Sequence, residues 1–366
     1  MPATPTSPPR PGLFGPPLTG WRLFDAMLPL GVVAIVLALA GQSPLWVFIF
    51  AALGLIPLAA VLGTATHRLA GSLGPLAAGV LEATLGNASE LILAVVALRA
   101  GLVEVVKASL TGSIISNLLL VLGMALLVGG LGREKQLLNR TVASSNATTL
   151  FLAAVGLVVP AVFSLGVYGE LAPNRPVLES LSLWDAGILI AVYAVSLYFQ
   201  LKAHPGAPHA HRDRRNLAPF LTMLATVAMI AVLSELLVGQ LEVAEHAFHG
   251  TDLFWGGVVF ALIGNAAEHG IAITAARRDE MDLAMAIGVG SSLQIALLLA
   301  PAMVFVSRML GHPMSLVFTG IEVVAVVLST LMVGMVAADG ETNWLEGAQL
   351  LAVYAILVIG FYFAPV

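Results

Sequence analysis

The sequence lacks cysteine and has few charged residues. None of its 366 residues is cysteine, and only 10% are Asp, Glu, Lys or Arg. The first absence excludes disulfides, zinc thiolate sites and thiol nucleophiles. The second excludes an ordinary soluble domain, in which about 25% of residues are charged. The net charge of −5 is small and gives no indication of nucleic-acid binding.

Apolar residues dominate what is present. They make up 59% of the chain, and the mean hydropathy is +0.97. Long apolar stretches recur from Phe24 to the C-terminus, each near the roughly 20 residues needed to cross a bilayer. The sequence therefore predicts an all-α polytopic membrane protein with eleven transmembrane helices. The expected spans are 24–41, 46–64, 72–98, 102–130, 144–166, 184–203, 217–239, 254–276, 281–307, 314–336 and 344–364.

Two polar segments flank or divide these spans. Residues 1–20 are rich in Pro and Gly and lack the apolar region of a signal peptide, so we expect a disordered tail. Residues 204–216 are basic and contain histidines, which indicates a solvated cytoplasmic linker loop. A histidine-based metal or pH sensor is the alternative interpretation of this loop.

The distribution of Lys and Arg predicts the orientation. With a cytoplasmic N-terminus, most basic residues fall in cytoplasmic loops, as the positive-inside rule requires. The C-terminus is then expected on the opposite side. Short loops and the absence of a targeting segment favour a bacterial inner membrane.

One short motif occurs twice. Gly86-Asn87-Ala88-Ser89-Glu90 returns as Gly264-Asn265-Ala266-Ala267-Glu268, an offset of 264 − 86 = 178 residues. The same offset aligns Gly112-Ser113 with Gly290-Ser291, and Ser116 with Gln294, without a gap. Agreement over this length indicates an internal duplication.

The two copies are expected to run in opposite directions. The first motif lies in the third expected span and the second in the eighth, and an odd displacement of five spans inverts one copy. Inverted repeats place discontinuous helices and an ion site near the middle of the membrane. We therefore predict two inverted five-helix halves, 46–203 and 217–366, with 21–41 as a peripheral first transmembrane helix.

The repeated glutamates are the candidate ion-binding residues. A carboxylate in mid-membrane costs at least about 2.5–3.5 kcal/mol, so Glu90 and Glu268 need partners. Inversion brings the two face to face, and like charges in a low dielectric cannot both stay ionised and unpaired. One divalent cation or a proton on each glutamate would neutralise them, and these states exclude each other. The pair therefore predicts cation/proton antiport, whereas a helix–helix hydrogen bond is the structural alternative.

Neighbouring polar residues support this site. Asn87 and Asn265 each share a helix face with the motif glutamate and offer oxygen ligands suited to Ca²⁺. Gly86 and Gly264 permit close approach of the backbone. Ser113, Ser116, Asn117, Ser291 and Gln294 form the expected cavity wall or, alternatively, join helices by hydrogen bonds.

Three further residues are candidates, and two of them have two interpretations each. His269 either tunes Glu268 and relays protons, or has a structural role. Glu82 either lines the path to Glu90 or caps a polar pocket. Glu235 is placed for an access route.

Several strings resemble the calcium/proton exchangers, the CAX family of the Ca²⁺/cation antiporter superfamily. They are LEATLGNASELI, GSIISNLLLVLG, SELLVG and GNAAEH, and the resemblance runs from about Leu55 to the end. It implies eleven helices, one peripheral plus two inverted sets of five, with sliding of the second and seventh spans. It also implies that cytosolic Ca²⁺ is exported for H⁺ by alternating access. The site implied by the resemblance contains Glu90, Glu268, Ser89, Ser116, Asn117, Ser292 and Gln294.

The function implied is transport without a cofactor, with Ca²⁺, H⁺ and the lipid bilayer as the only expected partners. Na⁺/H⁺, K⁺/H⁺ or Na⁺-driven Ca²⁺ exchange on the same scaffold is the alternative. An enzyme is disfavoured because no Ser/His pair, zinc motif or aspartate dyad is present. Two features depart from the family: 204–216 is basic where many members have an acidic helix, and 63–68 lacks glutamates found in many relatives. The oligomeric state stays open.

Overall fold

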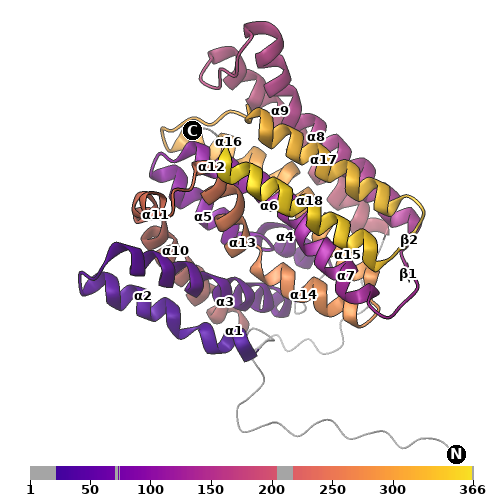
Figure 1. Cartoon of the computed structure of the whole chain (residues 1–366), viewed down its shortest axis with the longest axis horizontal. Helices are drawn as coiled ribbons and strands as arrows, with labels where there is room; N and C mark the ends of the chain where they lie inside the picture. The colour runs from indigo at the N-terminus through magenta and orange to yellow at the C-terminus, as the bar shows by residue number, and fades with distance from the viewer. Residues whose placement is uncertain (1–21, 71–72, 74, 204–216, 365–366) are drawn as a thin grey trace, which may run out of the picture.

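The computed structural model describes residues 22–70, 73, 75–203 and 217–364. These residues are almost entirely helical (Figure 1). The predicted tail at 1–20 and the linker at 204–216 lie outside the described residues.

Eight helices of the described chain are long and apolar enough to cross a bilayer. They are α3 (Pro44–Ala70), α6–η1–α7 (Val103–Gly130), α8 (Arg140–Tyr168), α9 (Pro176–Ala203), α10 (Ala218–Gly239), α15–η3–α16 (Met281–Met309), α17 (Gly320–Ala337) and α18 (Trp344–Phe363). The predicted all-α polytopic fold is confirmed.

The other three predicted spans are short or broken. They correspond to α1 (Arg22–Met27) with α2 (Pro29–Leu39), to α4 (Pro75–Leu85) with α5 (Ala88–Arg99), and to α12 (Asp252–Phe254), η2 (Trp255–Phe260), α13 (Ala261–Gly264) and α14 (Ala266–Arg277). A short helix, α11 (Leu241–Phe248), precedes α12 and bends by 111° from the segment after it. The arrangement is consistent with eleven spans.

Some helix ends differ from the predicted spans, because capping side chains rather than hydropathy set them. The tenth span was expected from 314, but α17 begins at Gly320. Thr319 and Glu322 form a reciprocal capping box there, with Thr319 N donating to Glu322 Oε2 at 2.9 Å. The fifth span extends back to the start of α8, where Asn139 Oδ1 accepts from Val142 N at 3.2 Å.

Three connections meet on one face of the molecule. Strand β1 (Gln136–Leu137), after α7, pairs antiparallel with β2 (Glu341–Thr342), between α17 and α18. The connection after α14 joins them, because Arg133 Nε lies 3.6 Å from Asp279 Oδ1. These three connections follow the fourth, eighth and tenth spans in the predicted order, all of them even-numbered.

Two ion pairs join the other set of connections, those that follow odd-numbered spans in the predicted order. Arg99 Nη1, at the end of α5, lies 3.5 Å from Glu235 Oε1 near the end of α10. Arg308 Nη1, at the end of α16, lies 4.0 Å from Glu179 Oε2 at the start of α9. Both pairs join span ends that the predicted topology puts opposite to the β1–β2 face. Which face is cytoplasmic stays a prediction.

The internal duplication reaches the helix boundaries. Helix α5 begins at Ala88 and α14 at Ala266, and 266 − 88 = 178. Helix α6 (Val103–Ile115) begins 178 residues before α15 (Met281–Gln294). The π-helical segments η1 (Ser116–Val121) and η3 (Ile295–Leu299) interrupt the two copies at nearly equivalent places. Helix starts and helix interruptions thus recur at the same or nearly the same offset, which supports two copies of one structural unit.

The two copies meet in the centre of the molecule. Figure 1 shows α2 and α3 along one edge and α8 and α17 along the opposite edge, with α4, α5, α6 and α13 between them. Helix α6 packs on η2 with its backbone, because a Cβ atom on Gly112 would collide with Gly257. This close crossing of glycines brings the first half of the chain against the segment that leads into the second motif.

Candidate functional site

The two motif glutamates occupy equivalent places at the start of broken helices. Glu90 and Glu268 are each the third residue of a helix, α5 and α14, and each helix follows a break at an asparagine. The N-terminus of a helix carries a partial positive charge that stabilises a nearby anion. Both breaks thus place a favourable dipole end beside a carboxylate.

The carboxylates are withdrawn from the surface and incompletely satisfied. Glu90 is 3% exposed. Two carboxylate oxygens, Glu90 Oε1 and Glu268 Oε2, are buried and have no hydrogen-bond partner among the described residues. A buried polar atom without a partner is costly. A cation or a proton at these oxygens would remove that cost.

The first motif contacts the second directly. A Cβ atom on Gly264 would lie 2.8 Å from Glu90 Cγ, so only glycine leaves room for this carboxylate. Ser89 Oγ donates to Glu90 Oε2 at 3.1 Å and to the carbonyl oxygen of Gly264 at 3.3 Å. The structure therefore places the carboxylate of Glu90 against the second motif.

A hydrogen-bonded chain of amides and hydroxyls runs beside the acids. Asn117 Nδ2 donates to Asn265 Oδ1 and to Ser291 Oγ, both at 2.9 Å. Ser291 Oγ donates to Asn87 Oδ1 at 2.8 Å, and Asn265 Nδ2 donates to Ser113 Oγ at 2.9 Å. Side chains from α6, η1 and α15 thus hold both motif asparagines.

This chain repeats the symmetry of the sequence. The offset of 178 relates Asn87 to Asn265 and Ser113 to Ser291. Each motif asparagine is therefore held by the serine of the opposite half. These crossed pairs were not predicted, although the offset aligned all four residues. The sequence predicted the inversion, but not its consequence that each serine faces the motif of the other copy.

The asparagine oxygens already accept hydrogen bonds within this chain. Asn87 and Asn265 were predicted as metal ligands together with Glu90 and Glu268. A carbonyl oxygen has two lone pairs, so one is left for a cation. No group of three or more Asp, Glu or His side chains able to hold a metal occurs in the part of the chain that the structure describes. A bound cation would thus rely on two carboxylates and on neutral oxygens.

The remaining predicted residues divide between the site and its surroundings. Ser116 Oγ lies 3.5 Å from Nε2 of His269, next to Glu268. Ser292 Oγ donates to the carbonyl oxygens of Gly288 at 2.9 Å and Ile114 at 3.3 Å, which is a packing role between α15 and α6.

Gln294 contacts the first helix break. Its Nε2 donates to the carbonyl oxygen of Glu82 at 3.3 Å, and its Oε1 would lie 3.3 Å from a Cβ atom on Gly86. This contact places Gln294 beside the end of α4.

The two predicted access-path residues form ion pairs nearer the surface. Glu82 Oε1 lies 3.2 Å from Nδ1 of His67, a residue that sequence reasoning did not single out. Glu235 pairs with Arg99, and its side chain is 63% exposed. The two pairs belong to opposite faces in the predicted topology. An access role for either glutamate stays a prediction.

The chain is similar to known proteins over most of its length. The family of "Sodium/calcium exchanger protein" matches residues 43–202 and 218–363, within a few residues of the two predicted halves. A Ca²⁺/H⁺ antiporter of Synechocystis sp. is 44% identical over 348 residues, covering 89% of this chain and 93% of the relative. The Ca²⁺/H⁺ antiporter ChaA of Bacillus subtilis is 38% identical over 353 residues, covering 93% and 99%.

Solved structures agree with the sequence matches. The structure of native YfkE has a TM-score of 0.83 and 37% identity, and covers 93% of this chain and 99% of its own. The family model and these relatives confirm the resemblance seen in the motifs. The chain belongs to the sodium/calcium exchanger family.

Proposed function

We propose that this chain is a secondary antiporter that exports cytosolic Ca²⁺ in exchange for H⁺. The observation that carries the proposal is the pair of partly unsatisfied carboxylates, Glu90 and Glu268, supplied by two inverted motifs. Relatives named as Ca²⁺/H⁺ antiporters support the choice of ions.

Charge balance provides the coupling. Two carboxylates bind one Ca²⁺ with no net charge left over, and two protons neutralise the same pair. A site holding both cargoes would be positively charged, and an empty ionised site would be negatively charged; each state is costly in a low dielectric. Exchange follows because the site changes its access to the two sides only when it is neutral.

Alternating access in this proposal involves α3 and α10, the second and seventh spans. Halves 46–203 and 217–366 rearrange around the glutamates, and the serine–asparagine bonds keep the two motifs in register. The N-terminus is cytoplasmic and the C-terminus lies on the other side, in a bacterial inner membrane.

Reconstituted vesicles test the proposal. The purified full chain in proteoliposomes should accumulate radioactive Ca²⁺ when a pH gradient is imposed. Glu90→Gln and Glu268→Gln should each abolish this uptake, because the amide cannot exchange a proton for a metal. Glu242→Gln is the matched control, since the Glu242 side chain is 88% exposed on α11.

Three results would overturn the proposal. Uptake at the wild-type rate in either site variant would exclude a shared site. Proton-driven uptake of Na⁺ or K⁺ with no Ca²⁺ flux, or Ca²⁺ flux that needs Na⁺, would assign the alternative exchange reactions.

A further inference from the structure

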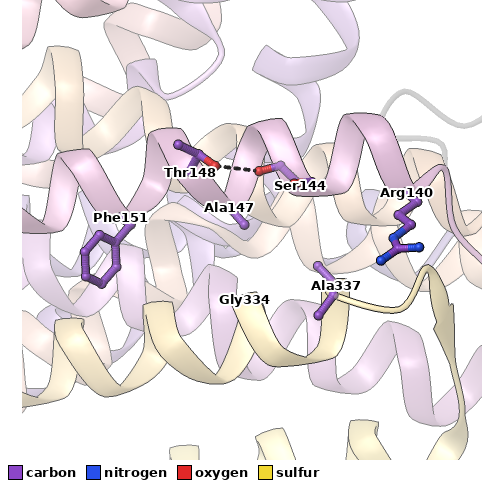
Figure 2. Close-up of a pocket in the computed structure, with 8 residues that line it drawn as sticks. Arg140, Ser144, Ala147, Thr148, Phe151, Gly334 and Ala337 are labelled. Atoms are coloured by element: carbon purple, nitrogen blue, oxygen red, sulfur yellow. Dashed lines mark hydrogen bonds between the residues drawn. The ribbon is translucent and has the colours of Figure 1, made fainter.

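A groove lies between α8 and α17, away from the glutamates. It has a volume of about 460 Å³ and is walled by residues near the start of α8 and the end of α17. Figure 2 shows Arg140 at one end and Phe151 at the other, with Gly334 and Ala337 on the facing helix. A positive charge therefore lies at one end of the groove and an aromatic ring at the other.

Arg140 is a cation without a partner among the residues that the structure describes. Neighbouring basic residues are paired, Arg133 with Asp279 and Lys135 with Glu341. Within the described ranges, the guanidinium of Arg140 forms no ion pair or hydrogen bond. Its exposed side chain is thus available to an anion from outside the protein.

Of the two hydroxyl groups near Arg140, one already donates a hydrogen bond within the described chain and the other does not. Thr148 Oγ1 donates to the carbonyl oxygen of Ser144 at 3.0 Å, as drawn in Figure 2. The hydroxyl of Ser144 forms no hydrogen bond with the described residues and lies one turn from Arg140. A guanidinium and a hydroxyl one turn apart suit a phosphate group.

The length of α8 indicates that the Arg140 end of the groove lies at the depth of lipid headgroups. Helix α8 has 29 residues. At 1.5 Å per residue its length is about 43 Å, which exceeds the roughly 30 Å hydrocarbon core of a bilayer. Its first turn, with Arg140, therefore reaches the headgroup region. Phe151 lies eleven residues further along, about 16 Å deeper.

We propose that this groove binds an anionic phospholipid. The lipid phosphate pairs with Arg140 and accepts a hydrogen bond from Ser144, and an acyl chain runs along Gly334 toward Phe151. The groove changes from charged at Arg140 to apolar at Phe151, as a lipid changes from its headgroup to its acyl chains. A soluble anion would not occupy the apolar part. This site is independent of the ion-exchange proposal.

Lipid retention tests the site. Native mass spectrometry of the full chain measures retention of dioleoylphosphatidylglycerol against dioleoylphosphatidylcholine. The wild type should prefer the anionic lipid, and Arg140→Gln should weaken its retention about fivefold, the effect of one interfacial cation. Arg140→Lys should keep most of the preference. Arg175→Gln is the matched control, because that arginine is paired with Glu170 elsewhere.

A groove-filling variant tests the acyl chain. A Cβ atom on Gly334 meets nothing within 4 Å, so Gly334→Leu should fold, with an unchanged melting temperature, and should displace the lipid. An unchanged lipid preference in Arg140→Gln would refute the proposal, and so would undiminished retention in Gly334→Leu. Displacement of the lipid by millimolar inorganic phosphate would also refute it and would assign a free-anion site.

Discussion

Each motif asparagine depends on a serine from the opposite half of the molecule. Ser291→Ala removes the donor to Asn87 Oδ1, and Ser113→Ala removes the acceptor for Asn265 Nδ2. A buried polar group that loses its partner costs about 1–3 kcal/mol. We expect both substitutions to lower the melting temperature in detergent and to slow exchange, because each releases the asparagine at the start of the helix that carries a motif glutamate.

Ser180→Ala provides the control for that prediction. Its hydroxyl donates only to the carbonyl oxygen of Pro176 in its own exposed helix turn. This variant should unfold and transport like the wild type. Equal behaviour of all three serine variants would mean that the crossed bonds contribute nothing.

At the residue scale, the sequence singled out the repeated glutamates but not the hydrogen bonds around them. Repetition at one offset identified Glu90 and Glu268, because a charged pair in apolar spans is conspicuous. The pairing of Asn117 with Asn265 and Ser291 depends on side-chain directions around η1, and a sequence does not specify these. The same limit hid the contact between His67 and Glu82.

At the scale of elements, two equivalent glycines have opposite environments. A Cβ atom on Gly112 of α6 would collide with Gly257 of η2, whereas one on Gly290 of α15 meets nothing within 4 Å. Gly112→Ala should destabilise the protein by about 1–3 kcal/mol, the usual cost of overpacking. Gly290→Ala should be neutral or stabilising by up to about 1 kcal/mol through helix propensity.

Unfolding in detergent, followed by circular dichroism, distinguishes the two variants. A large loss in Gly112→Ala with none in Gly290→Ala would establish the backbone crossing of α6 and η2. A similar small effect in both would contradict it.

Apolar runs predicted where most helices lie, but not where they end or break. The runs cannot show that the capping box of Thr319 and Glu322 delays the start of α17. They also do not show that α5 and α14 start anew after Asn87 and Asn265. These breaks are set by packing of polar side chains between helices, which hydropathy does not describe.

At the scale of the whole molecule, the paired connections determine which loops share a face. The absence of native cysteine makes labelling straightforward. Cysteine in place of Lys135, beside the β1–β2 sheet, should react with an impermeant maleimide only after the membrane is permeabilised. Cysteine in place of Glu242, on α11, should react from outside intact cells. The reverse pattern would invert the proposed orientation and would turn export into import.

The central claim is that one pair of carboxylates holds either Ca²⁺ or protons. Proton release on Ca²⁺ addition tests it most directly, measured with the purified protein in weakly buffered solution. We expect the wild type to release protons as it binds Ca²⁺, and its Ca²⁺ affinity to fall as the pH falls, because protonated carboxyls lose the charge that attracts the metal. Glu90→Gln and Glu268→Gln should release fewer protons and bind Ca²⁺ more weakly. Tight Ca²⁺ binding by the wild type with no proton release at any pH would contradict the claim.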